Sequence, residues 1–383
     1  MSVVRVALLG FGTVGSAVSR RLIESATHAD NPITLTHILD RHAGEKAFAP
    51  ESVAPIVWTT GIDDILHSDV DIVIEVIGGI EPALEWVRRA LGTGKSVVTA
   101  NKQLVARHGP ELWALASRQG RQFRFEAAVG GAMPIVRAIV DGLAGDRLSR
   151  LVAILNGTTN AVLSRMEATS CSLNEALADA RDRGYAEADP RADLDGDDAR
   201  AKLAILCALA FGVRVEASDI PARSARSIQA GDFIEAQRRQ RTIRQLAHAE
   251  YDRTRSRLSA WVGPVFVLAD SVFARATGPQ NVAVVTGEHS GEIGIFGAGA
   301  GGDATAVAIL GDVVSIARDR AVIVPPPRLT SDFTLEVSNG GAFEWAGAFA
   351  ASPAQRLRGS ADAGSAAQHV GLGAMAGAVV EAI

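Results

Sequence analysis

The chain has 383 residues, which is long enough for two domains, and 48% hydrophobic with 21% charged residues describes an ordinary globular protein. A formal net charge of -5 and an aromatic content of 5% argue against nucleic-acid binding. The longest strongly apolar run, residues 203–213, is too short for a bilayer, which takes about 20 residues. No targeting segment is visible, and Cys171 and Cys207 lack metal-ligand spacing. We therefore expect a cytoplasmic protein with reduced thiols and no membrane partner.

The first part of the chain has a pattern typical of a dinucleotide-binding domain. An apolar run at residues 3–9 predicts a buried parallel strand, and residues 16–23 have helical spacing. A GxGxxG turn lies between them, formed by Gly10, Phe11, Gly12, Thr13, Val14 and Gly15. Its glycines permit a tight turn and let a pyrophosphate approach the helix N-terminus. The strand–turn–helix setting favours a coenzyme site over a purely structural turn.

A second strand, residues 33–39, ends at Asp40 and Arg41. Asp40 can accept hydrogen bonds from the ribose hydroxyls of NAD. Arg41, with Lys46 nearby, can instead pair with the 2′-phosphate of NADP. The choice between NAD and NADP stays open at this point.

Three further strands are predicted at residues 71–77, 96–99 and 123–126, with a helix at 81–91. Ligands of parallel sheets bind beyond the carboxyl ends of the strands, so Gly78 and Lys102 are candidate coenzyme residues. The alternative for Lys102 is an ordinary surface lysine. The bend after Glu126 is rich in carbonyl groups and can hold a hard cation, although a plain strand-to-helix turn is the simpler interpretation.

Beyond residue 134 the pattern changes to that of a second, α+β domain. Helices are predicted at residues 135–143, 173–183, 198–211 and 233–249, and strands at 151–155, 258–268, 281–287 and 292–296. The helix at 233–249 is expected to expose an Arg-rich face. A glycine-rich turn, residues 297–302, opens a helix at 303–317.

These elements predict the α/β fold class, with an N-terminal Rossmann-type dinucleotide-binding domain at residues 1–134 and a second domain at 135–302. We expect residues 303–325 to form a helix that returns to the nucleotide domain. Residues 326–383 form a tail of unknown role, with one strand-like piece at 332–337.

The most informative stretch of the chain runs from Gly184 to Leu206. Asp198 and Lys202 are four residues apart in a predicted helix, so they share a face, and apolar Ile205 continues that face. Lysine occurs only at positions 46, 95, 102 and 202, whereas every other cation is Arg. A buried lysine can give up its proton and an arginine cannot. These observations favour a proton-transferring amine at Lys202 over a solvated ion pair.

Taken together, the motifs resemble those of the homoserine dehydrogenase family. The matching blocks are GFGTVG (10–15), DIVIEVIGGIEPA (71–83), VVTANKQLVARHG (97–109), FEAAVGGAMPIVRAI (125–139), LNGTTN (155–160), GYAEADPRADLDGDDARAKLAIL (184–206) and GAGAGGDATAVAILGD (297–312). They follow the family's order from the N-terminus to about residue 320. The resemblance implies NAD(P)-dependent interconversion of L-homoserine and L-aspartate 4-semialdehyde. It also implies a homodimer or homotetramer formed through the second, substrate-binding domain.

The resemblance also implies roles for individual residues. Lys202 corresponds to the catalytic acid/base, with Lys102 and Asp198 as further catalytic residues. The implied substrate pocket consists of Glu187, Asp193, Asp198, Gly157, Thr158 and Tyr185. Gly301 falls on a cofactor-binding position, and Glu126, Val129, Gly131 and Met133 fall on a loop that binds a monovalent cation, Na⁺ or K⁺. Carboxylates in the pocket suit a substrate that carries an ammonium group.

Two other functions remain open on the sequence. One is an NAD(P)-dependent dehydrogenase of another small hydroxy or keto acid, and the other is a non-catalytic dinucleotide-binding sensor. The retained Asp198 and Lys202 count against the sensor. Three features depart from the family pattern: the Arg-rich segment 218–257, the acidic Asp303 at a glycine-rich helix start, and a tail after Pro327 without an amino-acid-binding regulatory domain.

Overall fold

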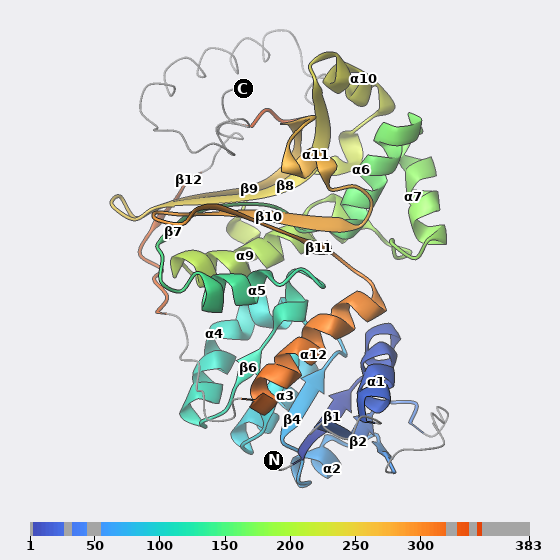
Figure 1. The fold of residues 1–383 in the computed structure, drawn as a ribbon, viewed down its shortest axis with the longest axis vertical. Helices are drawn as coiled ribbons and strands as arrows, with labels where there is room; N and C mark the ends of the chain where they lie inside the picture. Colours follow the sequence, from blue (N-terminus) through green and yellow to red (C-terminus); the bar gives the residue numbers. More distant parts are fainter. Residues whose placement is uncertain (1–2, 27–32, 44–54, 319–327, 337–342, 347–383) are drawn as a thin grey trace. The chain divides into compact units, whose positions relative to one another are not determined.

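The computed structural model describes residues 3–26, 33–43, 55–318, 328–336 and 343–346. The chain divides into two compact units, one of Met1–Arg137 with Ala300–Arg328 and one of Ala138–Gly299 with Leu329–Ile383. Each unit is built on its own six-stranded sheet (Figure 1). The predicted fold class, a dinucleotide-binding α/β domain followed by an α+β domain, is confirmed.

The first unit has a parallel sheet with strand order β3-β2-β1-β4-β5-β6. Its strands are β1 (Val4–Leu9), β2 (Ile33–Leu39), β3 (Val57–Thr59), β4 (Ile72–Glu75), β5 (Ser96–Thr99) and β6 (Phe123–Arg124). Its helices are α1 (Thr13–Ala26), α2 (Ile62–Leu66), α3 (Ala83–Gly92), α4 (Lys102–Arg118), α5 (Ile135–Arg137) and α12 (Gly302–Arg318). The strand order reverses between β1 and β4, which is where open α/β sheets bind ligands.

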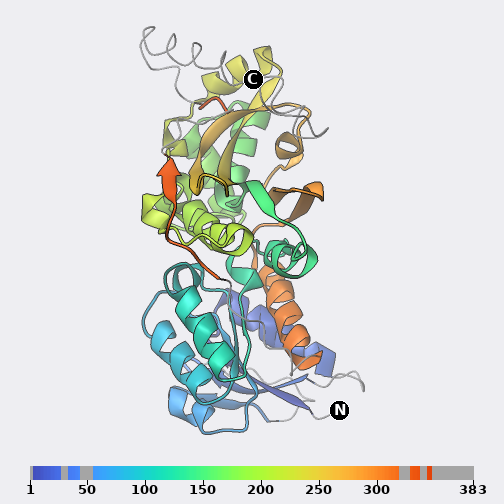
Figure 2. The ribbon, with the colours of Figure 1, turned by 90° about the vertical axis from the view of Figure 1, so that its left-hand side faces the viewer.

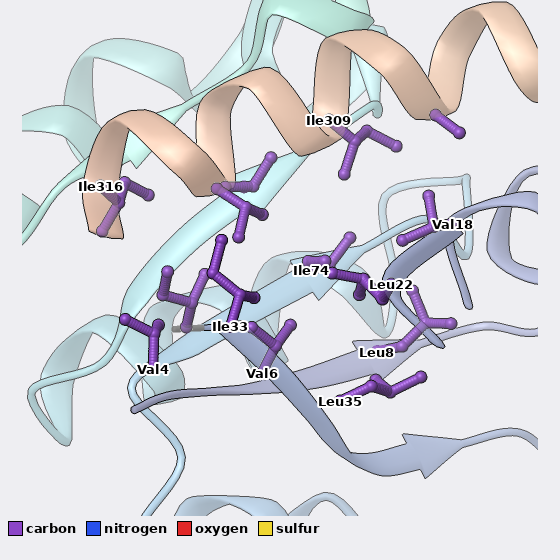
Figure 3. Close-up of a cluster of buried hydrophobic side chains, with 14 of the residues drawn as sticks. Val4, Val6, Leu8, Val18, Leu22, Ile33, Leu35, Ile74, Ile309 and Ile316 are labelled. Carbon is purple, nitrogen blue, oxygen red and sulfur yellow. The ribbon is translucent and has the colours of Figure 1, made fainter. Parts of the chain in front are cut away.

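The core of this unit joins segments from both ends of the described sequence. Leu8 of β1 and Ile74 of β4 pack with Val18 of α1 and with Ile309 and Ile316 of α12 (Figure 3). Helix α12 lies beside α1 in two views at right angles (Figure 1 and Figure 2). Burial of apolar side chains on both helices therefore ties residues after 300 to the sheet formed by residues before 130.

The second unit has a mixed sheet with strand order β11-β10-β7-β8-β9-β12. Its strands are β7 (Leu148–Ile154), β8 (Arg241–Asp252), β9 (Arg257–Leu268), β10 (Gln280–Gly287), β11 (Gly291–Ala298) and β12 (Thr334–Glu336). Its helices include α6 (Gly157–Thr169), α7 (Leu173–Asp182), α8 (Arg191–Leu194), α9 (Asp197–Phe211), α10 (Ala230–Arg238) and α11 (Val272–Arg275). On β8, Ile243 packs with α6, α7 and α10, whereas Leu246 packs with Trp261 and Phe273. Strand side chains alternate, so both faces of this sheet are covered.

Among the helices of the described ranges, none combines the length and the apolarity that a membrane span requires.

The predicted helix at residues 233–249 is wrong beyond residue 238. Helix α10 ends at Arg238, and β8 begins at Arg241 and pairs with both β7 and β9. Arg244 was expected to be solvated, but it is buried, with its guanidinium 2.8 Å from Glu167 and 2.9 Å from the Ala274 carbonyl oxygen. Pairing with strands elsewhere in the chain overrides the local helical pattern.

Other differences from the sequence predictions are local. The helix expected at residues 135–143 is one α-helical turn followed by a π-helical segment, Ala138–Gly142. Helix α4 was not predicted, since Gly109 and Pro110 lie inside it and both disfavour a helix interior. The short elements β3, α2 and α8 were not predicted either.

His248 of β8 makes the stability of the fold depend on pH. Its buried ring stacks on Trp261 with the centroids 5.1 Å apart. Burial, reinforced by Arg150, lowers the pKa of His248 to about 3. In the unfolded chain the same imidazole binds a proton near pH 6.5. The free energy of unfolding therefore falls as the pH drops below about 6.5, and it continues to fall until about pH 3. We expect His248→Phe to remove about 1.4 kcal/mol of the stability lost between pH 7.5 and 5.5, measured by urea denaturation. An unchanged pH dependence in the variant would contradict this assignment.

Candidate functional site

The parallel strands of the first unit bring most of the predicted coenzyme residues to one edge of the sheet, because the carboxyl ends of parallel strands meet there. The GxGxxG turn follows β1, Asp40 follows β2, and Gly78 and Lys102 follow β4 and β5. The residues collected at this edge are Gly10, Phe11, Gly12, Thr13, Val14, Gly15, Asp40, Arg41, Gly78 and Lys102.

The GxGxxG turn leaves room for a ligand at its centre. Gly10 has a φ of +98°, and a Cβ there would lie 3.1 Å from the Val76 carbonyl oxygen. A Cβ on Gly15 would clash with the Gly10 carbonyl oxygen, so the turn and the helix pack closely. A Cβ on Gly12, in contrast, would have no atom within 4 Å. The turn is thus packed where it meets its own sheet and open at Gly12, which fits a phosphate at the N-terminus of α1.

Asp40 fastens this turn to the end of β2. One oxygen of its buried carboxylate accepts a hydrogen bond from the Phe11 amide at 2.9 Å, and the other accepts from the His42 amide at 2.9 Å. Arg41 is exposed, and Lys46 lies outside the described residues. The carboxylate expected to contact a ribose therefore also holds the glycine turn in place.

A second glycine-rich helix start lies against the first one. Gly301 is exposed, with a φ of +118°, and a Cβ on Gly302 would lie 3.0 Å from the Thr13 carbonyl oxygen. The N-termini of α1 and α12 therefore lie next to each other, and the dipole of each helix favours an anion there. Gly302 was not singled out in the sequence, because its contact with Thr13 exists only in the folded unit.

Asp303, the unusual acidic residue at this helix start, pairs with α1. Its Oδ1 lies 2.7 Å from Arg20 Nη2 and 3.5 Å from Arg21 Nε, and the side chains of Arg20, Arg21 and Asp303 are 53%, 39% and 60% exposed. We expect Asp303→Asn to change the dissociation constant of NADPH by less than about twofold, because exposed pairs are weak and the two arginines already offset the carboxylate. Fluorescence titration measures this constant. Binding about tenfold tighter in the variant would show that Asp303 repels the coenzyme phosphates.

Glu126 begins a 3₁₀ turn, Glu126–Ala128, rather than ending β6. Its buried carboxyl accepts hydrogen bonds from the Val136 and Arg137 amides, both at 2.8 Å. Asp312 of α12 accepts from the Glu126 amide at 2.9 Å and from the Arg137 guanidinium at 2.9 Å. Burial, together with the charge of Asp312, raises the pKa of Glu126 to about 7.

The other residues expected to bind a cation lie in the same bend. Val129, Gly131 and Met133 are buried, and Gly131 has a φ of +63°. The Glu126 carboxyl is engaged on two amides, and within the described ranges no three His, Cys, Asp or Glu side chains are grouped so as to hold a metal ion. Within the bend, the Glu126, Gly130 and Met133 carbonyl oxygens accept hydrogen bonds from the Val129, Met133 and Ile135 amides.

The second unit places the predicted ion pair inside the protein. Lys202 Nζ lies 2.8 Å from Asp198 Oδ2 and donates to the Leu155 carbonyl oxygen at 2.8 Å. The two side chains are only 11% and 3% exposed. Helix α9 begins after Gly196, which has a φ of +86°, and Asp198 in its first turn suits the helix dipole. Among the described residues, the third N–H of Lys202 has no acceptor.

Asn156 links this pair to Asp193. Its Oδ1 accepts a hydrogen bond from the Thr159 amide at 2.7 Å and so caps α6. Its Nδ2 donates to Asp193 Oδ1 at 2.7 Å and to Asp198 Oδ2 at 2.9 Å. Two carboxylates can lie close together here because the amide group bridges them. Asn156 therefore both caps α6 and holds the two carboxylates in place.

The remaining predicted pocket residues surround this cluster to different degrees. A Cβ on Gly157 would lie 2.9 Å from the Pro279 carbonyl oxygen, so a larger residue does not fit. Thr158 Oγ1 donates to the Tyr185 carbonyl oxygen at 2.7 Å and holds the loop between α7 and α8. The side chains of Tyr185 and Glu187 are exposed on that loop, outside the hydrogen-bonded cluster of the described structure.

Comparison with known proteins identifies the family of this chain. One family model, described as homoserine dehydrogenase, NAD binding domain, matches residues 10–126, and a second, described as homoserine dehydrogenase, matches residues 134–314. Homoserine dehydrogenase of Corynebacterium glutamicum is 42% identical over 327 residues, which are 83% of this chain and 73% of that protein. The chain belongs to the homoserine dehydrogenase family.

Solved structures of homoserine dehydrogenases agree with this assignment. One from Thiobacillus denitrificans has a TM-score of 0.79 at 33% identity and covers 88% of this chain and 80% of its own. A hyperthermophilic archaeal homoserine dehydrogenase in complex with NADPH has a TM-score of 0.71 at 25% identity and covers 86% of this chain and 100% of its own. The chain is an oxidoreductase that acts on a CH–OH group with NAD(P), and the family recognised in its motifs is confirmed.

Proposed function

We propose that Lys202 is the acid/base of this homoserine dehydrogenase. Oxidation of L-homoserine to L-aspartate 4-semialdehyde removes a hydride from carbon and a proton from the hydroxyl oxygen. The Lys202 amine takes that proton, and in the opposite direction the ammonium returns it to the developing alkoxide. The observation that supports this role is a buried amine with two fixed acceptors and, within the described structure, a third N–H left for a substrate oxygen.

The acidic residues have separate roles in this proposal. Asp198 orients Lys202, since its carboxylate oxygen Oδ2 lies 2.8 Å from the lysine Nζ. Asp193, which Asn156 holds in place, and Glu187 on the neighbouring loop bind the ammonium of the substrate. Gly157, Thr158 and Tyr185 complete the pocket.

The first unit holds the coenzyme in this proposal, through Gly10–Gly15, Asp40 with Arg41, Gly78 and Gly301. Lys102, at the first turn of α4, is the second active-site lysine. When bound, NAD(P) accepts or supplies the hydride. The space at Gly12 and the two adjacent helix N-termini support a pyrophosphate at this edge.

The substrate assignment is tested by coenzyme reduction with L-homoserine and with 4-hydroxybutyrate, which keeps the hydroxyl and the carboxylate but lacks the ammonium. We expect kcat/KM to be at least about 100-fold lower for 4-hydroxybutyrate, since Asp193 and Glu187 then have no ammonium to bind. Equal values would remove Asp193 and Glu187 from substrate recognition. Turnover of other small hydroxy acids but not of L-homoserine would favour the alternative dehydrogenase.

We also propose that main-chain oxygens of the bend at residues 126–133 bind Na⁺ or K⁺. We expect faster turnover in KCl or NaCl than in tetraethylammonium chloride, because the organic cation is too large for a site of carbonyl oxygens. Initial rates at matched ionic strength measure this effect and cancel general screening. Identical rates in the three salts would contradict a cation in this bend.

A homodimer or homotetramer formed through the second unit, in the cytoplasm, belongs to the same proposal. Light scattering coupled to size-exclusion chromatography measures the assembly directly, and a monomer would contradict it.

A further inference from the structure

Glu75, the last residue of β4, is a fully buried carboxyl at the edge of the sheet where the coenzyme residues gather. Its strand lies next to β1, at the point where the strand order reverses. The two residues that follow it pack on the GxGxxG turn, because a Cβ on Gly10 would lie 3.1 Å from the Val76 carbonyl oxygen and 3.3 Å from Ile77 Cα. In the sequence, Glu75 lies inside the strand predicted at residues 71–77 and belongs to no predicted site.

The carboxyl of Glu75 connects the loop after β4 to the end of β5. Its Oε1 accepts hydrogen bonds from the Ile77 amide at 2.8 Å and from the Gly78 amide at 3.2 Å. Its Oε2 accepts from the Thr99 hydroxyl at 2.5 Å. Burial raises the pKa of Glu75, and these three hydrogen bonds oppose the shift. A buried carboxyl is costly unless it is bonded in this way, so its retention needs a structural or functional reason.

Asn101 extends the connection to the start of α4. Its amide donates to Thr99 Oγ1 at 3.0 Å, and its side-chain Nδ2 donates to the Gly79 carbonyl oxygen at 2.5 Å. Its Oδ1 accepts from the Leu104 amide at 3.1 Å and so caps α4, whose first residue is Lys102. The loop after β4 and the helix start that carries Lys102 are therefore joined by one hydrogen-bonded network.

We propose that Glu75 is a positioning residue for coenzyme binding, which holds the loop at residues 77–79 and, through Thr99 and Asn101, the Lys102 end of α4 in the geometry that receives NAD(P). It acts through backbone amides and a hydroxyl, and not by contact with reacting atoms. The inference rests on the proposed coenzyme site at Gly78 and Lys102.

The test compares Glu75→Ala, Glu75→Gln and Thr99→Val by fluorescence titration with NADPH and with NADH in the absence of substrate. We expect Glu75→Ala to raise the dissociation constant at least about tenfold, because it removes three hydrogen bonds of the network. Thr99→Val removes two of the network's hydrogen bonds, and we expect it to raise the constant about threefold. Glu75→Gln should stay within about threefold of the wild type. Its amide oxygen can accept from Ile77 and Gly78, while its NH₂ group donates to Thr99.

Leu91→Ala serves as the matched control for lost stability. Leu91 is fully buried near the end of α3, away from the loop after β4, so its truncation lowers the melting temperature while the dissociation constants stay unchanged. Dissociation constants of Glu75→Ala and Thr99→Val that equal those of Leu91→Ala would overturn the inference, because Glu75 would then serve stability alone. Glu75→Gln binding as weakly as Glu75→Ala would also overturn it, because the charge would then matter and not the geometry.

The outcome also separates this inference from the proposed function. The measurement needs no turnover, so the role of Lys202 does not affect it. Wild-type protein that binds neither coenzyme would overturn the proposed coenzyme site and the inference with it. Normal wild-type binding with unchanged variants would overturn the inference alone.

Discussion

Replacement of Lys202 by methionine is expected to lower kcat for L-homoserine by about 10²–10⁴-fold, the range typical of a lost acid/base group. Methionine fills a similar volume but offers no proton to the substrate oxygen. The dissociation constant of NADPH should stay within about twofold of the wild type, since the residue lies in the second unit and the proposed coenzyme residues lie in the first. Steady-state kinetics and fluorescence titration measure the two quantities.

Arg200→Met is the matched control for this experiment. Arg200 lies on the same helix, two residues before Lys202, and its guanidinium pairs at 2.5 Å with the exposed Asp197. The control makes the same change from a long cation to methionine away from the buried cluster, so we expect near-normal kcat. Near-normal rates in Lys202→Met as well would exclude Lys202 as the acid/base.

Replacement of Asp198 by asparagine is expected to lower both stability and turnover. The side chain keeps its shape and can still accept from Asn156, but the Lys202 ammonium loses its buried counter-charge. Breaking a buried ion pair on one side costs about 3–5 kcal/mol in general, and the partial exposure of Lys202 places our expectation at about 2–4 kcal/mol. We also expect kcat to fall at least about tenfold, because the amine is no longer oriented by a carboxylate. Urea denaturation and initial rates measure these effects.

The double variant Asp198→Asn with Lys202→Met separates the two effects. It removes both charges, so we expect much of the lost stability to return while turnover stays absent. Asp197→Asn is the control, since that side chain is 51% exposed and its removal should change stability by less than about 1 kcal/mol. Strictly additive losses in the double variant would contradict a coupled buried pair.

Local patterns were sufficient for much of the first unit and for helix α9. Buried parallel strands are short apolar runs, and a GxGxxG turn has one geometry, so β1, its turn and α1 follow from neighbouring residues. The shared face of Asp198 and Lys202 follows from helical spacing alone. In contrast, β8 was taken for a helix, because its strand character comes from pairing with β7 and β9 and not from its own residues.

The amino-acid sequence by itself determined the family, the coenzyme class and the residues around which the chemistry is proposed, because each depends on motifs of adjacent residues. Only the tertiary structure decided which long-range contacts hold those residues in position. The hydrogen bonds of Asn156 to Asp198 and of Thr99 to Glu75 span 42 and 24 positions, and that of Arg20 to Asp303 spans 283. Such contacts depend on how strands and helices pack, and packing arises from the burial of the whole core rather than from any local pattern.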